Sequence, residues 1–193
     1  SSVGHVAFSG NLAEAGAGGT IWSGGDVTAH TAASFSMTGN EARDGGGGAI
    51  YSDGNVTFSG VGALTFSDNH ASTYGGAIGA YGDITISDSG AASFSGNTAY
   101  EGGALDAYNV AISGNTGTVL FENNSAENAG GAINFIHAAD AIPDHLDSSR
   151  RPPVFLDDNA QAVLQRGLIR VGVCCGQQPG SQKKWEEVSY AHG

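Results

Sequence analysis

Residues 47–69 read Gly-Gly-Ala-Ile-Tyr-Ser-Asp-Gly-Asn-Val-Thr-Phe-Ser-Gly-Val-Gly-Ala-Leu-Thr-Phe-Ser-Asp-Asn, and this stretch recurs along the chain. A Gly pair, an alternating apolar and polar segment, and a Phe three residues before an Asn return in the same order in residues 75–97 and 102–124. The Gly pairs begin at residues 18, 47, 75, 102 and 130, which gives spacings of 29, 28, 27 and 28 residues. Self-similarity at such a fixed period predicts a solenoid in which each repeat forms one coil.

Each repeat contains three short segments with the alternation of a half-buried strand, separated by turn-forming Gly, Asn, Asp and Ser. Three strands and three turns in about 28 residues are typical of one coil of a parallel β-helix, and the crossover rule predicts right-handed coils. A single coil cannot bury its apolar side chains alone, so the coils must stack. The predicted fold is all-β: a right-handed parallel β-helix of about five coils of roughly 28 residues, with an irregular C-terminal segment.

Aligning the repeats predicts columns of side chains that stack from coil to coil in the core. The first strand supplies Ile21, Ile50, Ile78, Leu105 and Ile133. The second strand supplies Val27, Val56, Ile84 and Val110, with Ala29, Phe58, Ile86 and Ile112 two residues further on. The third strand supplies Val6, Ala33, Leu64, Ala92 and Val119, with Phe8, Phe35, Phe66, Phe94 and Phe121 two residues further on.

The Gly pairs and the recurring asparagines are predicted to shape the turns. Glycine reaches positive φ without steric cost, and its missing side chain lets neighbouring coils approach. Asparagine tolerates the left-handed conformation, and stacked asparagine amides can hydrogen-bond as a ladder. Because every coil repeats these residues, their expected role is structural.

The repeat pattern ends beyond Ile133, and the charge changes there. Residues 1–149 hold one basic residue against fifteen acids, whereas residues 150–193 hold six basic residues against four acids. We therefore divide the chain into a repeat body, residues 1–139, and an atypical C-terminal segment, residues 140–193. Within that segment, residues 160–166 are a candidate short helix and residues 167–173 a candidate capping strand. A native cap and a frameshifted tail both fit this composition.

Composition also narrows the classes of partner and cofactor. The net charge of −12 argues against nucleic acid, because phosphate backbones repel such a surface. No apolar run approaches the roughly 18 residues that a membrane-spanning helix needs. The six histidines are scattered, and the calcium repeats of some solenoids need a nine-residue period. We therefore predict no catalytic residue, no cofactor and no metal site, and leave weak calcium binding by acidic turns open.

The alternative hypothesis is that the chain is an enzyme, because some polysaccharide lyases and hydrolases also have the parallel β-helix fold. Such enzymes use clustered carboxylates, and acidic pairs of this kind can cleave glycosidic bonds. The candidates on the repeat body are Asp53, Asp68, Asp83, Asp88, Glu101 and Asp106. Aspartate is also an ordinary turn former, and the body offers Arg43 alone as a base or anion clamp, so we favour a structural role.

The two alternating motifs resemble the repeats of the polymorphic outer membrane proteins, surface autotransporters best known from chlamydiae. Gly-Gly-Ala-Ile/Leu begins at residues 47, 75, 102 and 130, and Phe-x-x-Asn begins at residues 8, 66, 94 and 121. The resemblance covers roughly residues 5–135. It implies a fragment of an exported β-helical passenger at the outer membrane, cell surface or outside the cell. It also implies adhesion as a virulence trait, and anchoring of the full-length protein through a C-terminal membrane barrel outside this sequence.

Residues that vary between coils are where a partner would be recognised. The outward position of the first strand runs Trp22, Tyr51, Gly79, Asp106, Asn134. Aromatic anchors dominate many interfaces, so Trp22, Tyr51, Asp106 and Asn134 are the candidate partner-binding residues, for a host-cell protein or glycan. Two alternatives remain: these side chains pack against a surface loop or neighbouring coil, or the whole chain is a purely structural solenoid segment.

Overall fold

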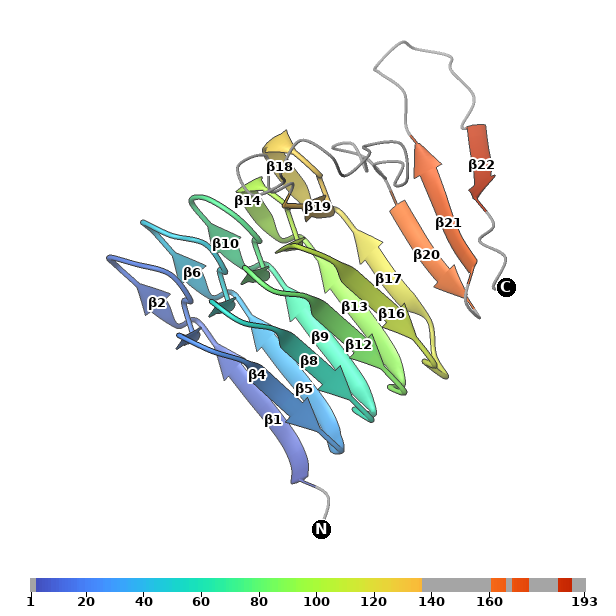
Figure 1. Cartoon of the computed structure of the whole chain (residues 1–193), viewed down its shortest axis with the longest axis horizontal. Helices are drawn as coiled ribbons and strands as arrows, with labels where there is room; N and C mark the ends of the chain where they lie inside the picture. Colours follow the sequence, from blue (N-terminus) through green and yellow to red (C-terminus); the bar gives the residue numbers. More distant parts are fainter. Residues whose placement is uncertain (1–2, 137–160, 166–167, 174–183, 189–193) are drawn as a thin grey trace, which may run out of the picture.

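The computed structural model describes residues 3–136, 161–165, 168–173 and 184–188. Within these residues the chain is all-β and contains no helix. Parallel strands stack as a solenoid of about five coils, from the N-terminal coil to the coil that ends in β19 (Figure 1). The predicted fold class is confirmed.

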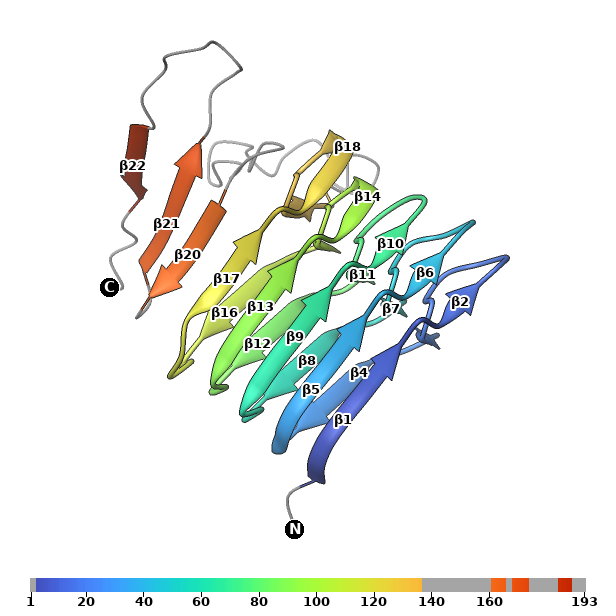
Figure 2. The same cartoon turned by 180° about the vertical axis from the view of Figure 1, so that it is seen from behind.

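Two broad sheets form the long walls of the solenoid and face each other (Figures 1 and 2). One wall contains β1 (Val3–Ser9), β5 (Ala32–Thr38), β9 (Ala63–Ser67), β13 (Ala91–Ser95) and β17 (Val119–Glu122). The opposite wall contains β4 (Val27–His30), β8 (Val56–Ser59), β12 (Ile84–Ser87) and β16 (Val110–Ser113).

Two narrower sheets complete each coil at the end where the broad walls separate (Figure 2). One contains β3 (Ile21–Ser23), β7 (Ile50–Ser52), β11 (Ile78–Ala80), β15 (Leu105–Ala107) and β19 (Ile133–Phe135). The other contains β2 (Leu12–Ala13), β6 (Glu41–Ala42), β10 (His70–Ala71), β14 (Thr98–Glu101) and β18 (Ser125–Ala129). The predicted count of three strands per coil is therefore wrong. Three of the five strands in this additional sheet, β2, β6 and β10, have two residues each, too few to show an alternation in sequence.

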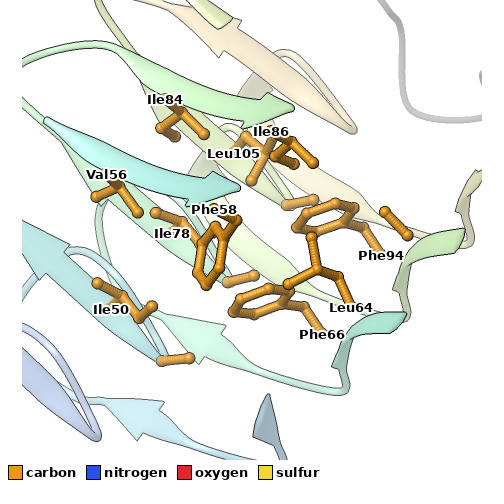
Figure 3. Packing of buried hydrophobic residues seen from close by; sticks show 14 of the residues in the cluster. Ile50, Val56, Phe58, Leu64, Phe66, Ile78, Ile84, Ile86, Phe94 and Leu105 are labelled. Atoms are coloured by element: carbon orange, nitrogen blue, oxygen red, sulfur yellow. The ribbon is translucent and has the colours of Figure 1, made fainter. Parts of the chain in front are cut away.

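The register confirms two of the predicted core columns. In the first strand, Ile50 pairs with Ile21 and Ile78, and Leu105 pairs with Ile78 and Ile133. The predicted partners of the second strand also align, including the column Ala29, Phe58, Ile86, Ile112. Figure 3 shows the members of these columns that are buried in the core: Ile50, Val56, Phe58, Ile78, Ile84, Ile86 and Leu105. The members nearer the ends of the stack, such as Ile21, Val110 and Ile112, are partly buried.

The phenylalanine column differs from prediction at one coil. Met37 pairs with Phe8 and Phe66, whereas Phe35 pairs with Val6 and Leu64. The expected core position of Ala33 is therefore wrong, and Ala33 is exposed. Met37 lies three residues before an asparagine, as phenylalanine does in the other coils, and its flexible side chain fills a comparable volume.

The rings of this column pack closely. Phe66, Phe94 and Phe121 stack with centroid separations of 5.1 and 4.7 Å and interplanar angles of 2° and 6°. Phe58 crosses from the opposite wall and meets Phe66 edge-on at 5.6 Å (Figure 3). The two walls are thus joined by aromatic contacts as well as by aliphatic packing.

The predicted asparagine ladder is confirmed. The side-chain amides of Asn11, Asn40, Asn69, Asn97 and Asn124 form a continuous chain in which each Nδ2 donates to the next Oδ1 at 2.9–3.0 Å. Each acceptor Oδ1 also receives the backbone N–H of the asparagine one coil earlier. In the last three coils Nδ2 makes a second bond, to a backbone carbonyl of the preceding coil. The buried amides of Asn69 and Asn97 are therefore fully hydrogen-bonded, as burial requires.

The left-handed conformation falls one residue earlier than predicted. The residue before each ladder asparagine has positive φ: Gly10, Gly39, Asp68, Gly96 and Asn123. The asparagines themselves do not have positive φ, because their amides are held in the ladder. Three coils place glycine at the strained position, where it has no steric cost.

Replacing Asp68 by glycine is expected to stabilise the protein. Asp68 has φ of 56°, and the left-handed conformation costs a non-glycine residue about 1 kcal/mol. Part of that gain is offset because glycine makes the unfolded chain more flexible, so we expect an increase of about 0.5 kcal/mol in unfolding free energy. Urea unfolding measures it, and a loss of stability would contradict the assigned strain.

The Gly pairs have both predicted roles. The first glycine of each pair has φ between 61° and 69°, at Gly18, Gly47, Gly75, Gly102 and Gly130. The second glycine lies against the next coil: a Cβ on Gly48 would collide with the carbonyl oxygen of Gly76. The pair therefore turns the chain and lets successive backbones come together.

Part of the C-terminal segment extends one of the broad walls. There β20 (Gln161–Gln165) pairs with β17 in the antiparallel direction and is followed by β21 (Leu168–Val173) and β22 (Lys184–Val188). The predicted strand at residues 168–173 is confirmed, and the helix expected at residues 160–166 is wrong, since residues 161–165 form a strand. The proposed domain boundary at residues 139–140 lies outside the described residues.

Candidate partner-binding face

The sequence of outward positions on the first strand is confirmed as a spatial column. Trp22 pairs with Tyr51, Tyr51 with Gly79, Gly79 with Asp106, and Asp106 with Asn134. Their exposure differs strongly: Trp22 is 61% exposed, Tyr51 and Asn134 are half-buried, and Asp106 is 2% exposed. The column therefore begins as an exposed aromatic surface and passes into a buried polar cluster.

Tyr51 connects the column to a group of tyrosines that the sequence did not single out. Its ring meets that of Tyr81 edge-on at 5.9 Å. Burial, followed by the hydrogen bond with Tyr81, raises the pKa of Tyr51 well above its usual value. Tyr74 and Asp53 also lie close enough to contribute to that shift.

We call this surface the tyrosine face and define it as Trp22, Tyr51, Tyr74, Tyr81 and Tyr108 with the carboxylates Asp53 and Glu101. Trp22, Tyr74, Tyr81 and Tyr108 are between 41% and 61% exposed. Tyr81 directly follows β11 and Tyr108 directly follows β15, and the backbone N–H of Tyr108 donates to the carbonyl oxygen of Gly82, the residue after Tyr81. A signal was present in the sequence: five of the six tyrosines lie between residues 51 and 108, in or near first strands.

Asp106, Asn134 and Glu101 form a cluster at the C-terminal end of the column. Asn134 Nδ2 donates to Asp106 Oδ2 at 2.8 Å and to Glu101 Oε2 at 3.5 Å. Burial raises the pKa of Asp106 to about 6; the bond from Asn134 opposes that shift and the charge of Glu101 adds to it. Asp106 was expected to face a partner, but its burial beside these two side chains keeps it from the surface.

The Asp106→Asn substitution is expected to stabilise the protein at neutral pH. Because the pKa of Asp106 is about 6 when folded, against an ordinary 3.8, the folded state binds the proton more tightly. The unfolding free energy of the native chain therefore falls as pH rises from about 4 to 6, by up to about 3 kcal/mol. The variant should lack this fall. Urea unfolding at pH 4.5 and 7.5 measures it, with exposed Asp53→Asn as the control for one lost charge; equal slopes would contradict the assignment.

The other carboxylates considered for catalysis do not join this cluster. Asp68 and Asp88 lie in turns with φ of 56° and 50°. Asp83 Oδ1 accepts a hydrogen bond from Asn109 Nδ2 at 2.8 Å. Arg43, the candidate base or clamp, is bonded to Glu14 at 2.8 Å and to Glu41 at 3.0 Å. These hydrogen bonds raise the pKa of Arg43, so it remains protonated.

Searches of the described residues found neither a metal-ligand cluster nor a membrane-spanning helix. No group of three or more His, Cys, Asp or Glu there is arranged to hold a metal ion. No helix in that part of the chain is long and apolar enough to cross a bilayer.

The family comparison matches the unit that the structure reveals. The model of the Chlamydia polymorphic membrane protein repeat matches residues 34–53, 63–81 and 118–135. Each matched stretch contains a strand of one broad wall, a ladder asparagine, a Gly pair and a first strand. Three stretches of the chain thus match the Chlamydia polymorphic membrane protein repeat. No curated protein and no solved structure gave a significant match.

The match to this repeat family implies a surface-associated passenger of the autotransporter type, at the outer membrane or cell surface. The matched repeats also carry part of the tyrosine face. Tyr51 and Asp53 lie in the first of them, and Tyr74 and Tyr81 lie in the second. The Gly-Gly-Ala-Ile/Leu and Phe-x-x-Asn motifs typical of the polymorphic membrane protein repeat are thus the ones that form the turns and core of each coil. The tyrosines lie outside these motifs, at positions that vary from coil to coil.

Proposed function

We propose that this chain is part of a non-enzymatic passenger displayed on the cell surface, where the tyrosine face adheres to a host-cell partner. The observation that carries the proposal is the set of exposed and half-buried aromatic side chains on the sheet of β3, β7, β11, β15 and β19 and in the turns beside it. Tyrosine and tryptophan lose little conformational entropy on binding and present large contact areas, so they are effective anchors. The asparagine ladder and the packed core columns hold in place the backbone that carries these aromatic side chains.

A non-enzymatic role is favoured by the state of the carboxyl cluster. A general acid must reach the bond that it protonates, and a raised pKa at Asp106 beside Glu101 is the pattern expected of such a pair. Asp106 is 2% exposed, however, and its Oδ2 already accepts a hydrogen bond from Asn134 Nδ2 at 2.8 Å. The cluster is therefore best explained as a buried polar contact between coils.

Adhesion can be tested with the full chain immobilised on beads and incubated with cultured epithelial cells. We expect cell binding, and a loss of roughly tenfold after combined Trp22→Ala and Tyr51→Ala substitutions. Leu12→Ala removes an exposed side chain from β2, a strand that holds no residue of the tyrosine face, and should leave binding unchanged. If native beads bind no cells, the purely structural solenoid becomes the better reading.

The enzyme alternative has its own test. Incubation of the full chain with polysaccharides, with and without calcium, is expected to release no new reducing ends or unsaturated products. Release that disappears in both Asp106→Asn and Glu101→Gln would overturn the non-enzymatic proposal and identify that pair as catalytic.

A further inference from the structure

We infer that the tyrosine face binds an uncharged oligosaccharide, lying along the stack so that successive sugar rings meet aromatic rings of successive coils. This inference rests on the proposed adhesive function and specifies its ligand. The face combines exposed rings with hydrogen-bonding side chains, and it includes no exposed large hydrophobic side chain that lacks a polar group. The exposed Leu12 and Phe8 lie on β2 and β1.

The rings are held in place before any ligand arrives. A Cβ added at Gly46 would lie 3.1 Å from Tyr74 Cδ2 and 3.3 Å from Tyr51 Cδ2, and one added at Gly79 would lie 3.4 Å from Tyr51 Cδ2. Tyr51 and Tyr74 therefore pack against backbone that only glycine leaves bare. A site with fixed rings spends less binding free energy on ordering side chains.

The spacing of the coils suits a chain of sugar rings. Neighbouring strands lie about 4.8 Å apart, so paired residues such as Trp22 and Tyr51 repeat at roughly the length of one sugar unit in a chain. Sugar rings present C–H faces with partial positive charge, which the negative face of an aromatic ring attracts. A periodic polymer can repeat this contact from coil to coil.

Polar groups of the face match sugar hydroxyls. The carboxylates of Asp53 and Glu101 are strong acceptors for hydroxyl donors, and the Asn134 amide already contacts Glu101 at 3.5 Å. Residues 3–136 contain a single Lys or Arg, Arg43, which is paired with Glu14 and Glu41. Within residues 3–136, a sulfated, sialylated or uronic-acid glycan would meet negative charge with no unpaired Lys or Arg to offset it, so the ligand should be uncharged.

The inference can be tested on an array that carries uncharged oligosaccharides beside their sulfated and sialylated counterparts. The full chain should bind a subset of the uncharged ones. Tyr108→Ala should weaken that binding about tenfold or more, while Tyr108→Phe, which keeps the ring, should change it less than about threefold. Leu12→Ala is the matched control, and thermal unfolding of each variant confirms that the fold is retained.

Three results would overturn the inference. One is preferential binding of the anionic glycans. Another is equal binding by native chain and Tyr108→Ala. The third is failure to bind any glycan while the bead assay still shows cell binding that depends on Trp22 and Tyr51. That third result leaves adhesion in place and points to a protein ligand, which capture of an Arg- and Lys-rich peptide would support. Loss of cell binding altogether would remove the adhesive function as well.

Discussion

The Gly76→Ala substitution is expected to lower the unfolding free energy by about 3 kcal/mol or more. An added Cβ would collide with the carbonyl oxygen of Gly103 and lie 2.6 Å from the backbone nitrogen of Thr98. Both groups belong to the next coil, and both are backbone, so a rotamer change cannot relieve the clash. The coils would have to separate, which breaks hydrogen bonds between them.

Urea unfolding of native and variant chains measures the loss. Gly25→Ala is the matched control, because an added Cβ there would meet nothing within 4 Å and the residue does not have positive φ. That control should stay within about 0.5 kcal/mol of the native chain. A Gly76→Ala variant of native stability would mean that the coils are not in close backbone contact.

The Asn97→Asp substitution is expected to cost about 3–5 kcal/mol at neutral pH. Asn97 Nδ2 donates to Asn124 Oδ1 at 2.9 Å and to the carbonyl oxygen of Phe66 at 3.0 Å. A carboxylate cannot donate either bond and would place a buried negative charge beside two acceptor oxygens. Its pKa should therefore rise, so part of the lost stability should return as pH falls and the carboxyl becomes a donor.

Unfolding of native and variant chains at pH 7.5 and 4.5 measures both the loss and its recovery. Asn11→Asp is the control, because Asn11 is in the same ladder but is exposed at its first coil. We expect this control to cost less than about 1 kcal/mol. Equal losses at the two positions would show that burial of the ladder has no energetic effect.

The sequence predicted what every coil repeats. Gly pairs at a near-constant spacing define the coil, and inward residues such as Ile50 and Val56 can be aligned without structural knowledge. The prediction was wrong in the coil where a different residue type occupies the same core position. Met37 replaces phenylalanine in its column, and alignment by residue type therefore selected Phe35, two residues away.

The candidate site was only partly predictable for a different reason. Trp22 and Tyr51 lie in the first strands of neighbouring coils, whose register follows from the repeat, so their column could be predicted from the sequence. Tyr74 and Tyr81 lie in turns, where neither residue type nor alternation fixes direction. Their contacts with Tyr51 arise because neighbouring coils and neighbouring turns meet in space. Burial of Asp106 likewise depends on side chains from two coils.

Hydrogen bonds between coils run along the stack, as the bonds from Asn40 to Asn69 and from Asn69 to Asn97 illustrate. A pulling force applied along that axis therefore acts on the bonds of one interface between coils at a time. When an end coil detaches, its roughly 28 residues extend to about 90 Å, far more than the height that the coil occupied. A surface protein built this way would lengthen stepwise under flow and absorb mechanical work while its remaining coils stay attached.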